Sequence, residues 1–249
     1  MLVAASTECF RDLPLHDAIG RLVDLEYASV EIAIDEDGIQ LRPSEVESNF
    51  DKAVALCRET HRLNVVAYAV NIRATGEEYY RHFRAICKLA KATKVVTLVV
   101  PSSELGTPFN EEVERLRRLV DVAALEGARV GMLTTIGCLT EDPDTAVVLC
   151  DNVKGLGLTL DPSHYVCGPH SRRNTGKLMK YVFHVHLRDS TKDALQVRIG
   201  QGEIEYGRLI SQLRKVHYNR ALSVHLRELP DVDHTGEMRK MRLLLESLL

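Results

Sequence analysis

The sequence predicts an α/β fold, a single (β/α)8 TIM barrel in which residues 1–249 form one domain. Apolar, β-branched runs alternate along the whole chain with charged segments whose apolar residues recur at helical spacing. Eight such pairs fit into 249 residues, and a closed barrel has this number of strand–helix units in a chain of this length. No linker rich in Pro, Gly or Ser divides the chain.

The apolar runs predict eight strands, over residues 2–6, 29–34, 64–70, 94–100, 129–135, 157–161, 183–187 and 221–226. Runs such as KVVTLVV are typical of parallel strands that are buried on both faces. The segments between and after them predict eight helices, over residues 15–25, 44–61, 77–91, 111–126, 142–152, 175–181, 206–217 and 237–248. Parallel strands need crossover connections of this length.

An open, doubly wound sheet is the competing architecture for a chain that alternates strand and helix. That fold is favoured by a glycine-rich fingerprint directly after the first strand. The corresponding stretch here, ASTECFRDLP, contains no glycine. The closed barrel is therefore the preferred prediction.

Composition excludes several classes of protein. A hydrophobic content of 45% with 27% charged residues is typical of a globular domain with a large core. The 32 basic and 35 acidic residues give a net charge of −3, so no nucleic-acid partner is expected. No window approaches the roughly 18 apolar residues that a membrane span needs, and no signal peptide is evident. We expect a cytoplasmic protein with no membrane partner, whose six widely spaced cysteines are reduced thiols.

Barrel enzymes place their chemistry at the carboxyl ends of the strands. Asp161 ends the sixth predicted strand, and His164 follows it in the loop. Period-two alternation puts His184 and His186 on one face of the seventh strand, and His225 lies on the eighth. A carboxylate and two imidazoles suit Zn, Mn, Fe or Co at a site with open positions. The alternative for each histidine alone is a hydrogen-bonded residue inside the barrel.

Three stretches in series, LGLTLDPSHY, FHVHLRDS and IGQGEIEYGRLISQL, together with SVEIAI on the second strand, carry a family resemblance. The chain resembles the xylose-isomerase-like barrel superfamily, which contains sugar isomerases, ketose 3-epimerases, inosose dehydratase-type enzymes and abasic-site endonucleases. The resemblance covers nearly the whole chain. It points to the superfamily rather than to one activity within it.

In the isomerase and epimerase members, one metal is held by a strand-five Glu, a strand-six Asp, a strand-seven His and a strand-eight Glu. Asp161 and His186 match the middle two, and His164 matches the loop His of the DPxH motif. Arg198 resembles the substrate-binding Arg of the epimerases. Glu31 is similar to a common strand-two Glu, with a salt-bridged or surface Glu as the alternative.

Two departures affect the acid/base positions of the family. Thr135 stands where the strand-five Glu is expected, and His225 replaces the strand-eight Glu. The threonine hydroxyl does not titrate near neutrality, whereas His225 could act as a base or a metal ligand. The expected ligands of one divalent metal (Zn, Mn, Fe or Co) are Asp161, His186 and His225, completed by His164 or water. A neutral imidazole in place of a carboxylate favours Zn, Fe or Co over the harder Mn or Mg.

The endonuclease members need extra histidines on strands three and four and an Asp-x-His pair before the glycine-rich stretch. Strands three and four read NVVAYAV and KVVTLVV, and Gln196 and Arg198 stand in place of the pair. The three-metal site of that branch therefore cannot be assembled, and DNA repair is not expected.

The leading prediction is a metal-dependent isomerase, epimerase or lyase acting on a small polyhydroxylated or keto substrate. Proton transfer is assigned to His164, Glu31 or His225, and substrate binding to Arg198, Asp189 and Lys192, with a polar surface loop as the alternative for the last two. A non-catalytic, sugar-binding barrel and a metal-dependent hydrolase stay open as alternatives, as does assembly into a homo-oligomer.

Two further loops allow a functional or a structural interpretation. Gly200 and Gly202 could let the backbone approach an anionic or hydroxyl-rich ligand, or could serve a turn with positive φ. Arg172 and Arg173 could bind a phosphate or belong to a solvated loop.

Overall fold

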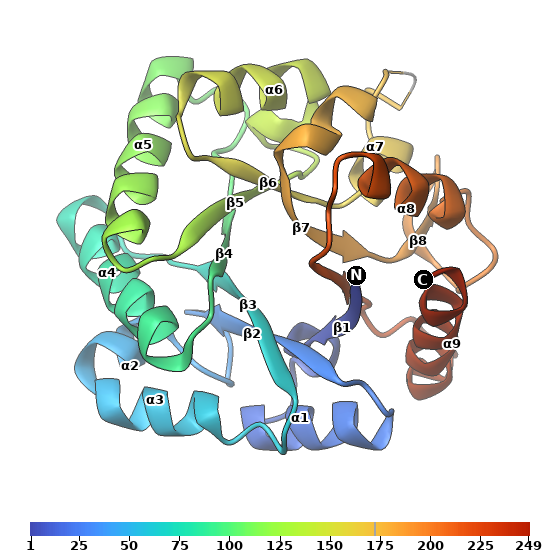
Figure 1. The fold of residues 1–249 in the computed structure, drawn as a ribbon, viewed down its shortest axis with the longest axis horizontal. Coiled ribbons are helices and arrows are strands. Elements are labelled where there is room, and N and C mark those ends of the chain that lie inside the picture. The colour runs from blue at the N-terminus through green and yellow to red at the C-terminus, as the bar shows by residue number, and fades with distance from the viewer. Residues whose placement is uncertain (172) are drawn as a thin grey trace.

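The computed structural model describes residues 1–171 and 173–249, and within these ranges eight parallel strands close a barrel (Figure 1). Around the barrel the strand order is β1-β10-β7-β6-β5-β4-β3-β2, and β2 pairs with β1 to close it. The barrel strands are β1 (Leu2–Ser6), β2 (Ser29–Asp35), β3 (Asn64–Asn71), β4 (Thr97–Pro101), β5 (Arg129–Leu133), β6 (Gly157–Leu160), β7 (Val182–Leu187) and β10 (Ala221–Val224). The predicted (β/α)8 TIM barrel is confirmed.

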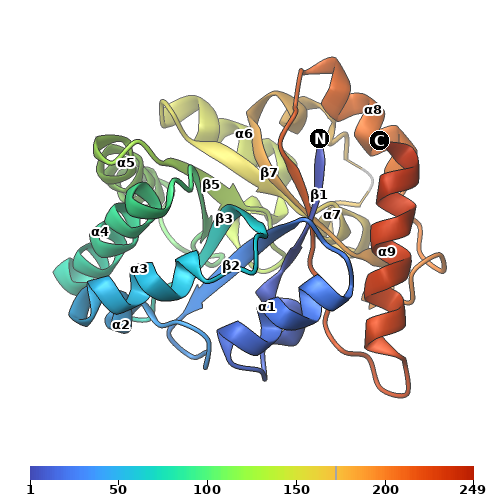
Figure 2. The same cartoon turned by 60° about the horizontal axis from the view of Figure 1, so that its bottom comes forward.

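Helices surround the strands, and the last helix runs along the outside of the barrel beside β1 (Figures 1 and 2). The α-helices are α1 (Leu15–Asp24), α2 (Pro43–Ser48), α3 (Phe50–Arg58), α4 (Gly76–Thr93), α5 (Phe109–Leu125), α6 (Pro143–Asn152), α7 (Ser163–Cys167), α8 (Tyr206–Lys215) and α9 (His234–Leu248). Among the described residues, three 3-10 helices accompany them, η1 (Thr7–Phe10), η2 (Leu139–Glu141) and η3 (Gly176–Tyr181). In the described part of the chain, no helix has the length and apolar character to cross a bilayer.

Alternation along the strands separates two environments. Residues of one parity, such as Val30, Ile32 and Val185, join the apolar core that the helices cover. Residues of the other parity are small or polar and buried, and they include Ala4, Ser6, Glu31, Thr159, His184, His186 and Ser223. The strands therefore carry a line of polar side chains on the barrel's inner face, leading to its carboxyl end.

Several predicted boundaries shift in the structure. The fourth strand begins at Thr97 because Lys94, with φ of 62°, ends α4 in a left-handed conformation. The predicted helix 44–61 is divided at Asn49, whose φ of −135° and ψ of 56° are not helical. The predicted helix 175–181 is the 3-10 helix η3.

A short hairpin at the barrel mouth was not predicted. It pairs β8 (Asp189–Thr191) with β9 (Ala194–Val197) in antiparallel fashion. Strands of three and four residues are too short to show an apolar period. This hairpin and α7 follow β7 and β6 directly, so both position residues at the carboxyl ends of those strands.

Candidate active site

Glu31 on β2 reaches the two histidines of β7 inside the barrel. Its Oε2 atom lies 2.6 Å from His184 Nε2 and 2.8 Å from His186 Nε2, and all three side chains are buried. Since an ionised carboxylate only accepts hydrogen bonds, both Nε2 atoms are assigned as donors. This assignment leaves the Nδ1 atom of a neutral His186 as an acceptor.

The charge of Glu31 is set by opposing effects. Burial raises the pKa of Glu31, but the charges and hydrogen bonds of the neighbouring His186 and His184 lower it by a larger amount. The pKa of Glu31 therefore lies well below its usual range. Glu31 is an anion at neutral pH.

His225 follows β10 and is held between an anion and a cation. Its Nε2 lies 3.3 Å from Glu8 Oε2, and its Nδ1 lies 3.1 Å from Arg188 Nη2. Because guanidinium only donates, the proton of a neutral His225 belongs on Nε2, facing Glu8. Burial lowers the pKa of His225, and nearby His186 and Arg188 add to this against the opposing effect of Glu8.

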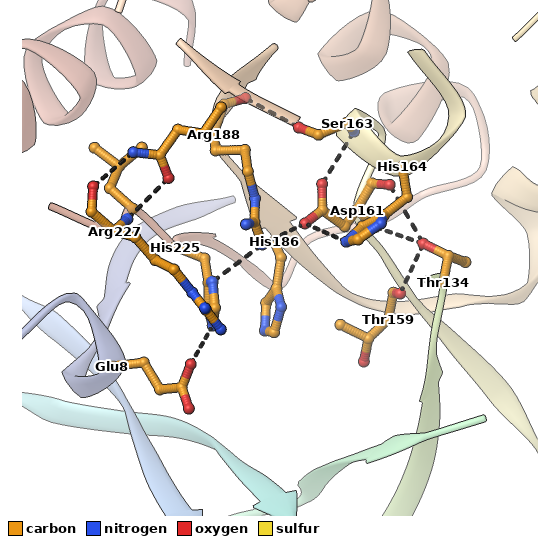
Figure 3. Close-up of polar contacts among 12 residues, drawn as sticks. Glu8, Thr134, Thr159, Asp161, Ser163, His164, His186, Arg188, His225 and Arg227 are labelled. Atoms are coloured by element: carbon orange, nitrogen blue, oxygen red, sulfur yellow. Dashed lines mark hydrogen bonds and ion pairs between the residues drawn. The ribbon is translucent and has the colours of Figure 1, made fainter. Parts of the chain in front are cut away.

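Asp161 lies directly after β6 and is fully buried. Its backbone N–H donates to Thr134 Oγ1 at 2.8 Å, and its Oδ1 accepts from the Ser163 backbone N–H at 3.0 Å. The Oδ2 atom lies 2.8 Å from Arg188 Nη2 without an aligned hydrogen bond (Figure 3). Burial raises the pKa of Asp161, but Arg188 and the neighbouring histidines outweigh it, so the pKa is lowered.

His164 on α7 is oriented by the backbone of the loop after β5. The Ile136 N–H donates to its Nδ1 at 3.1 Å, so Nε2 carries the proton of the neutral ring. Nε2 lies 3.7 Å from Asp161 Oδ2. Burial lowers the pKa of His164 despite the opposing charge of Asp161. The ring is therefore mostly neutral at pH 7.

Three of these side chains lie close enough together to share one ligand. Glu31, His186 and His225 each offer one ligand atom, and these atoms lie within 4.8 Å of one another. In residues 1–171 and 173–249, no other trio of His, Cys, Asp or Glu side chains meets this distance. The rings of His186 and His225 are stacked, with centroids 4.6 Å apart. Asp161, the carboxylate that the sequence assigned to the metal, lies outside this set and beside Arg188.

Unpartnered polar atoms test whether the site suits a cation. Among the described residues, ten buried side-chain N or O atoms lack a hydrogen-bond partner, and four of them belong to Glu31, Asp161, His186 and Arg188. Buried polar atoms are normally satisfied, so water, an ion or a ligand is expected to complete the hydrogen bonding here. An anionic carboxylate such as Glu31 and neutral imidazoles such as those of His186 and His225 are electron-pair donors, so the residue types of this trio fit a divalent metal.

The structure offers no carboxylate at the end of β5 within its described residues. Thr135 presents a buried Oγ1 without a partner there. The next acid along the chain, Glu141, accepts from the Gly137 backbone N–H at 2.9 Å. The site thus lacks the strand-five acid that the family resemblance implies.

Asp189, one of the residues predicted to bind substrate, is held by the backbone of its own loop. Both oxygens of buried Asp189 are engaged by backbone N–H groups, Oδ1 by Ser190 at 3.2 Å and Oδ2 by Gly200 at 2.8 Å and Gly202 at 3.0 Å. A Cβ on Gly202 would lie 2.0 Å from Asp189 Oδ1, so only glycine fits. The anion that these glycines approach is therefore the chain's own Asp189.

The cations that the sequence singled out are exposed where the structure describes them. Arg198 is 52% exposed, with Nε 3.9 Å from Glu237 Oε1 on α9. Lys192 is 73% exposed at the turn of the hairpin. Arg173 pairs with Asp142 and Asp144, each at 2.7 Å, whereas Arg172 lies outside the described residues. The substrate-binding role of Arg198, Lys192 and Asp189 stays a prediction.

Two residues of the site were missed by the sequence reasoning. Arg188 shares the parity of His184 and His186, and extending that alternation by one step could have found it. Glu8 comes two residues after β1, where a barrel places its functional side chains.

Cavities flank Glu8 at the mouth of the barrel. One of about 500 Å³ is lined by Glu8, Arg11, Asp12, Arg21 and Glu228 among others. A smaller one of about 70 Å³ includes Glu8, Asp35 and Gln40. The larger cavity has a volume typical of small-molecule sites, and of the site residues described above only Glu8 lines it.

Known proteins share this architecture. A 3-keto-D-glucoside 4-epimerase from E. coli superposes with a TM-score of 0.76 at 16% identity, covering 99% of each chain. A D-tagatose 3-epimerase-like protein gives 0.76 at 17% identity, covering 100% of this chain and 98% of the other. A xylose isomerase-like TIM barrel protein from Mycobacterium smegmatis in complex with magnesium gives 0.75 at 15% identity, with the same coverage. At these identities the likeness shows the fold alone.

Sequence comparison gives the family directly. No curated protein matches the chain in sequence. The model of the xylose isomerase-like TIM barrel family matches residues 19–244. The chain belongs to the xylose isomerase-like TIM barrel family, whose structural neighbours here include sugar epimerases.

Proposed function

We propose that the chain is a sugar isomerase or epimerase-like enzyme that uses one divalent metal and acts on a small polyhydroxylated or keto substrate. The observation that carries the proposal is the buried trio Glu31, His186 and His225 inside a barrel of this family. The cavity beside Glu8 supports a small polar substrate. We also keep a cytoplasmic location and a homo-oligomer as parts of the proposal.

Glu31, His186 and His225 would hold the metal in this protein. When bound, the ion would polarise adjacent oxygens of the substrate as a Lewis acid. The sequence assigned this carboxylate position to Asp161, but Glu31 is the carboxylate that already lies with both histidines. His186 and His225 are common to the two ligand sets.

The remaining groups would orient the substrate and move protons. His164 presents Nε2–H from a ring fixed by the Ile136 amide, so it can donate a hydrogen bond or a proton to a substrate oxygen. Glu8 stands beside His225 at the edge of the cavity and can accept a hydrogen bond from a substrate hydroxyl. Glu31 would serve as an anion rather than as a proton donor, because its pKa is strongly lowered.

The test is metal content measured together with epimerisation. Protein purified without added metal or chelator is expected to contain about one equivalent of Zn, Mn, Fe or Co by elemental analysis, and a panel of ketoses is screened for C3 epimers and aldose isomers by NMR. Glu31→Gln and His186→Ala each remove a ligand and should weaken metal binding by more than the roughly 10-fold to 100-fold that losing a hydrogen-bond partner of a ligand costs. The control His16→Ala changes an exposed histidine on α1 and should keep wild-type metal content. Full metal content in both site variants would refute the proposal.

A non-catalytic sugar-binding barrel is the second candidate, and Arg188 is the observation that favours it. The guanidinium lies beside Asp161 and His225, where it supplies positive charge from within the chain. This candidate predicts ketose binding by calorimetry without turnover and without metal after incubation with each ion.

A further inference from the structure

Arg188 is a buried cation held in a fixed place by its neighbours. Its side chain is 8% exposed. Its carbonyl oxygen accepts hydrogen bonds from Tyr206 Oη at 3.0 Å and Ser163 Oγ at 3.4 Å, which anchor the backbone just after β7. The guanidinium therefore enters the site from a constrained position.

The guanidinium occupies the space between Asp161 and His225. Its Nη2 atom lies 2.8 Å from Asp161 Oδ2 and 3.1 Å from His225 Nδ1 (Figure 3). Its Nε is buried and has no partner in the described part of the chain. One guanidinium nitrogen thus contacts two of the three side chains that the sequence assigned to the metal.

A divalent cation at Asp161 and His225 would need the same electron pairs that Arg188 uses. The other nitrogen of His225 faces Glu8, and Asp161 Oδ1 accepts from the Ser163 N–H. Arginine stays protonated throughout the usual pH range, so its charge also repels an incoming cation. Metal and guanidinium cannot occupy this position together.

We propose that Arg188 acts as a resident cation that competes with a divalent metal for Asp161 and His225, and so determines both the metal affinity and the ligand set. This inference rests on the proposed function, since it concerns the same metal. In the wild type Asp161 is the counterion of Arg188, so the ligand carboxylate is Glu31, and a metal that binds His225 must displace the guanidinium from its Nδ1. Without Arg188, Asp161 becomes a ligand.

The test compares Co²⁺ binding to the wild type, Arg188→Met and Arg188→Lys by calorimetry, with the absorption spectrum of bound Co²⁺ as a second measurement. Arg188→Met should bind Co²⁺ at least about tenfold more tightly, with a changed spectrum because the ligand set gains a carboxylate. Arg188→Lys keeps the charge and should bind less tightly than Arg188→Met. Equal or weaker binding by Arg188→Met than by the wild type would overturn the proposal.

A second pair of variants covers the case in which Arg188→Met fails to fold because Asp161 is left as a buried, unpaired anion. Asp161→Asn is compared with Asp161→Asn/Arg188→Met, which leaves no such charge. The double variant should bind Co²⁺ about tenfold more tightly, because His225 Nδ1 is released. Equal affinity would overturn the inference.

The two proposals fail separately. If the wild type binds no metal but Arg188→Met does, the resident cation is supported and the metal-dependent function of the natural protein is refuted. If the wild type binds metal through Glu31 and Arg188→Met binds it equally, the function stands and the competition is refuted.

Discussion

At the scale of single residues, fixed hydrogen-bond partners assign the protons of the site. Arg188 donates to Nδ1 of His225, and the Ile136 amide donates to Nδ1 of His164. Glu31 accepts from Nε2 of both His184 and His186. A carboxylate that holds one imidazole nitrogen orients the other nitrogen and raises its basicity as a ligand.

Thr135 stands near the end of β5, where the family resemblance implies a glutamate, and its hydroxyl can be tested for a structural role. Its Oγ1 is buried without a partner among the described residues, which is unfavourable for folding. Thr135→Val keeps the shape and removes the oxygen, so we expect a gain of about 1 kcal/mol in the free energy of unfolding. Urea unfolding measures it.

The neighbouring Thr134 provides the matched control. Its Oγ1 accepts from the Asp161 N–H at 2.8 Å, so Thr134→Val should lower the free energy of unfolding by about 1 to 3 kcal/mol. A loss of stability in Thr135→Val as large as that of Thr134→Val would show that the Thr135 hydroxyl has a partner in solution.

At the scale of elements, α5 is tied to the end of β4 by an ion pair between a buried glutamate and a half-buried arginine. Glu112 on α5 is fully buried and accepts from Arg115 Nε at 2.7 Å and from the Ser103 N–H at 3.0 Å. Arg115 also donates to the Pro101 carbonyl at 2.9 Å, at the last residue of β4. The pair therefore fixes the loop that leaves the barrel at this strand.

Stability should depend on pH through Glu112. Burial raises its pKa, but Arg115 and Ser103 outweigh that effect and lower it below the usual value of 4.5. A carboxyl whose pKa is depressed in the folded state stabilises the fold above the unfolded-state pKa, and this contribution disappears as the pH falls through the folded-state pKa. Glu112→Gln should cost about 2 kcal/mol at pH 7, and less as the pH falls below about 4.5.

Thermal unfolding of Glu112→Gln and wild type between pH 3 and pH 7 measures this dependence. Glu111→Gln, at the exposed neighbouring position on the same helix, is the control and should unfold like the wild type at each pH. A destabilisation by Glu112→Gln that stays constant over the whole range would contradict the assigned charge.

The elements that the sequence predicted well are those with a long, regular pattern. β1 has its predicted bounds because LVAAS is followed by the polar residues Thr7 and Glu8, and β2 and β3 each extend one residue further. Lys94 and Asn49 were misassigned because single backbone conformations, rather than apolar periods, end α4 and divide α2 from α3.

The residues of the candidate site also differ in how far the sequence could predict them. His186 and His225 could be placed together from alternation and strand order alone. Glu31 was weighed against a salt-bridged alternative, because its contact with His186 spans 155 positions of sequence. The position of Arg188 beside Asp161 could be recognised only from coordinates, since the choice between a metal and a guanidinium as the partner of Asp161 depends on side-chain direction.

At the scale of the whole molecule, the site joins the two ends of the chain. β1 pairs with β10, which brings Glu8 within 3.3 Å of His225 across 217 positions of sequence. Tyr27 Oη donates to the Met238 carbonyl at 2.8 Å and ties α9 to the first half of the barrel. Glu31 and His186 likewise come from opposite halves. A ligand held by these side chains binds the closed barrel and not the unfolded chain.

Metal should therefore stabilise the entire fold. A ligand that binds only the native state adds about 2.7 kcal/mol at a free concentration of 100 Kd. In a domain of this size each kcal/mol raises Tm by roughly 2 to 4 °C, so saturating Mn²⁺ or Co²⁺ should raise Tm by about 5 to 10 °C and a chelator should reverse it. His186→Ala should abolish the rise.

His16→Ala provides the control for surface binding. His16 and His61 are exposed, with Nε2 atoms 3.3 Å apart, so they offer an independent place for a cation. If the stabilisation came from that pair, His16→Ala would lose it and His186→Ala would keep it, which is the reverse of the expected pattern. Stabilisation that survives in His16→Ala and disappears in His186→Ala would place the ion inside the barrel. In that case the free energy of metal binding contributes directly to closing β1 against β10, because Glu31 and His225 come together only in the closed barrel.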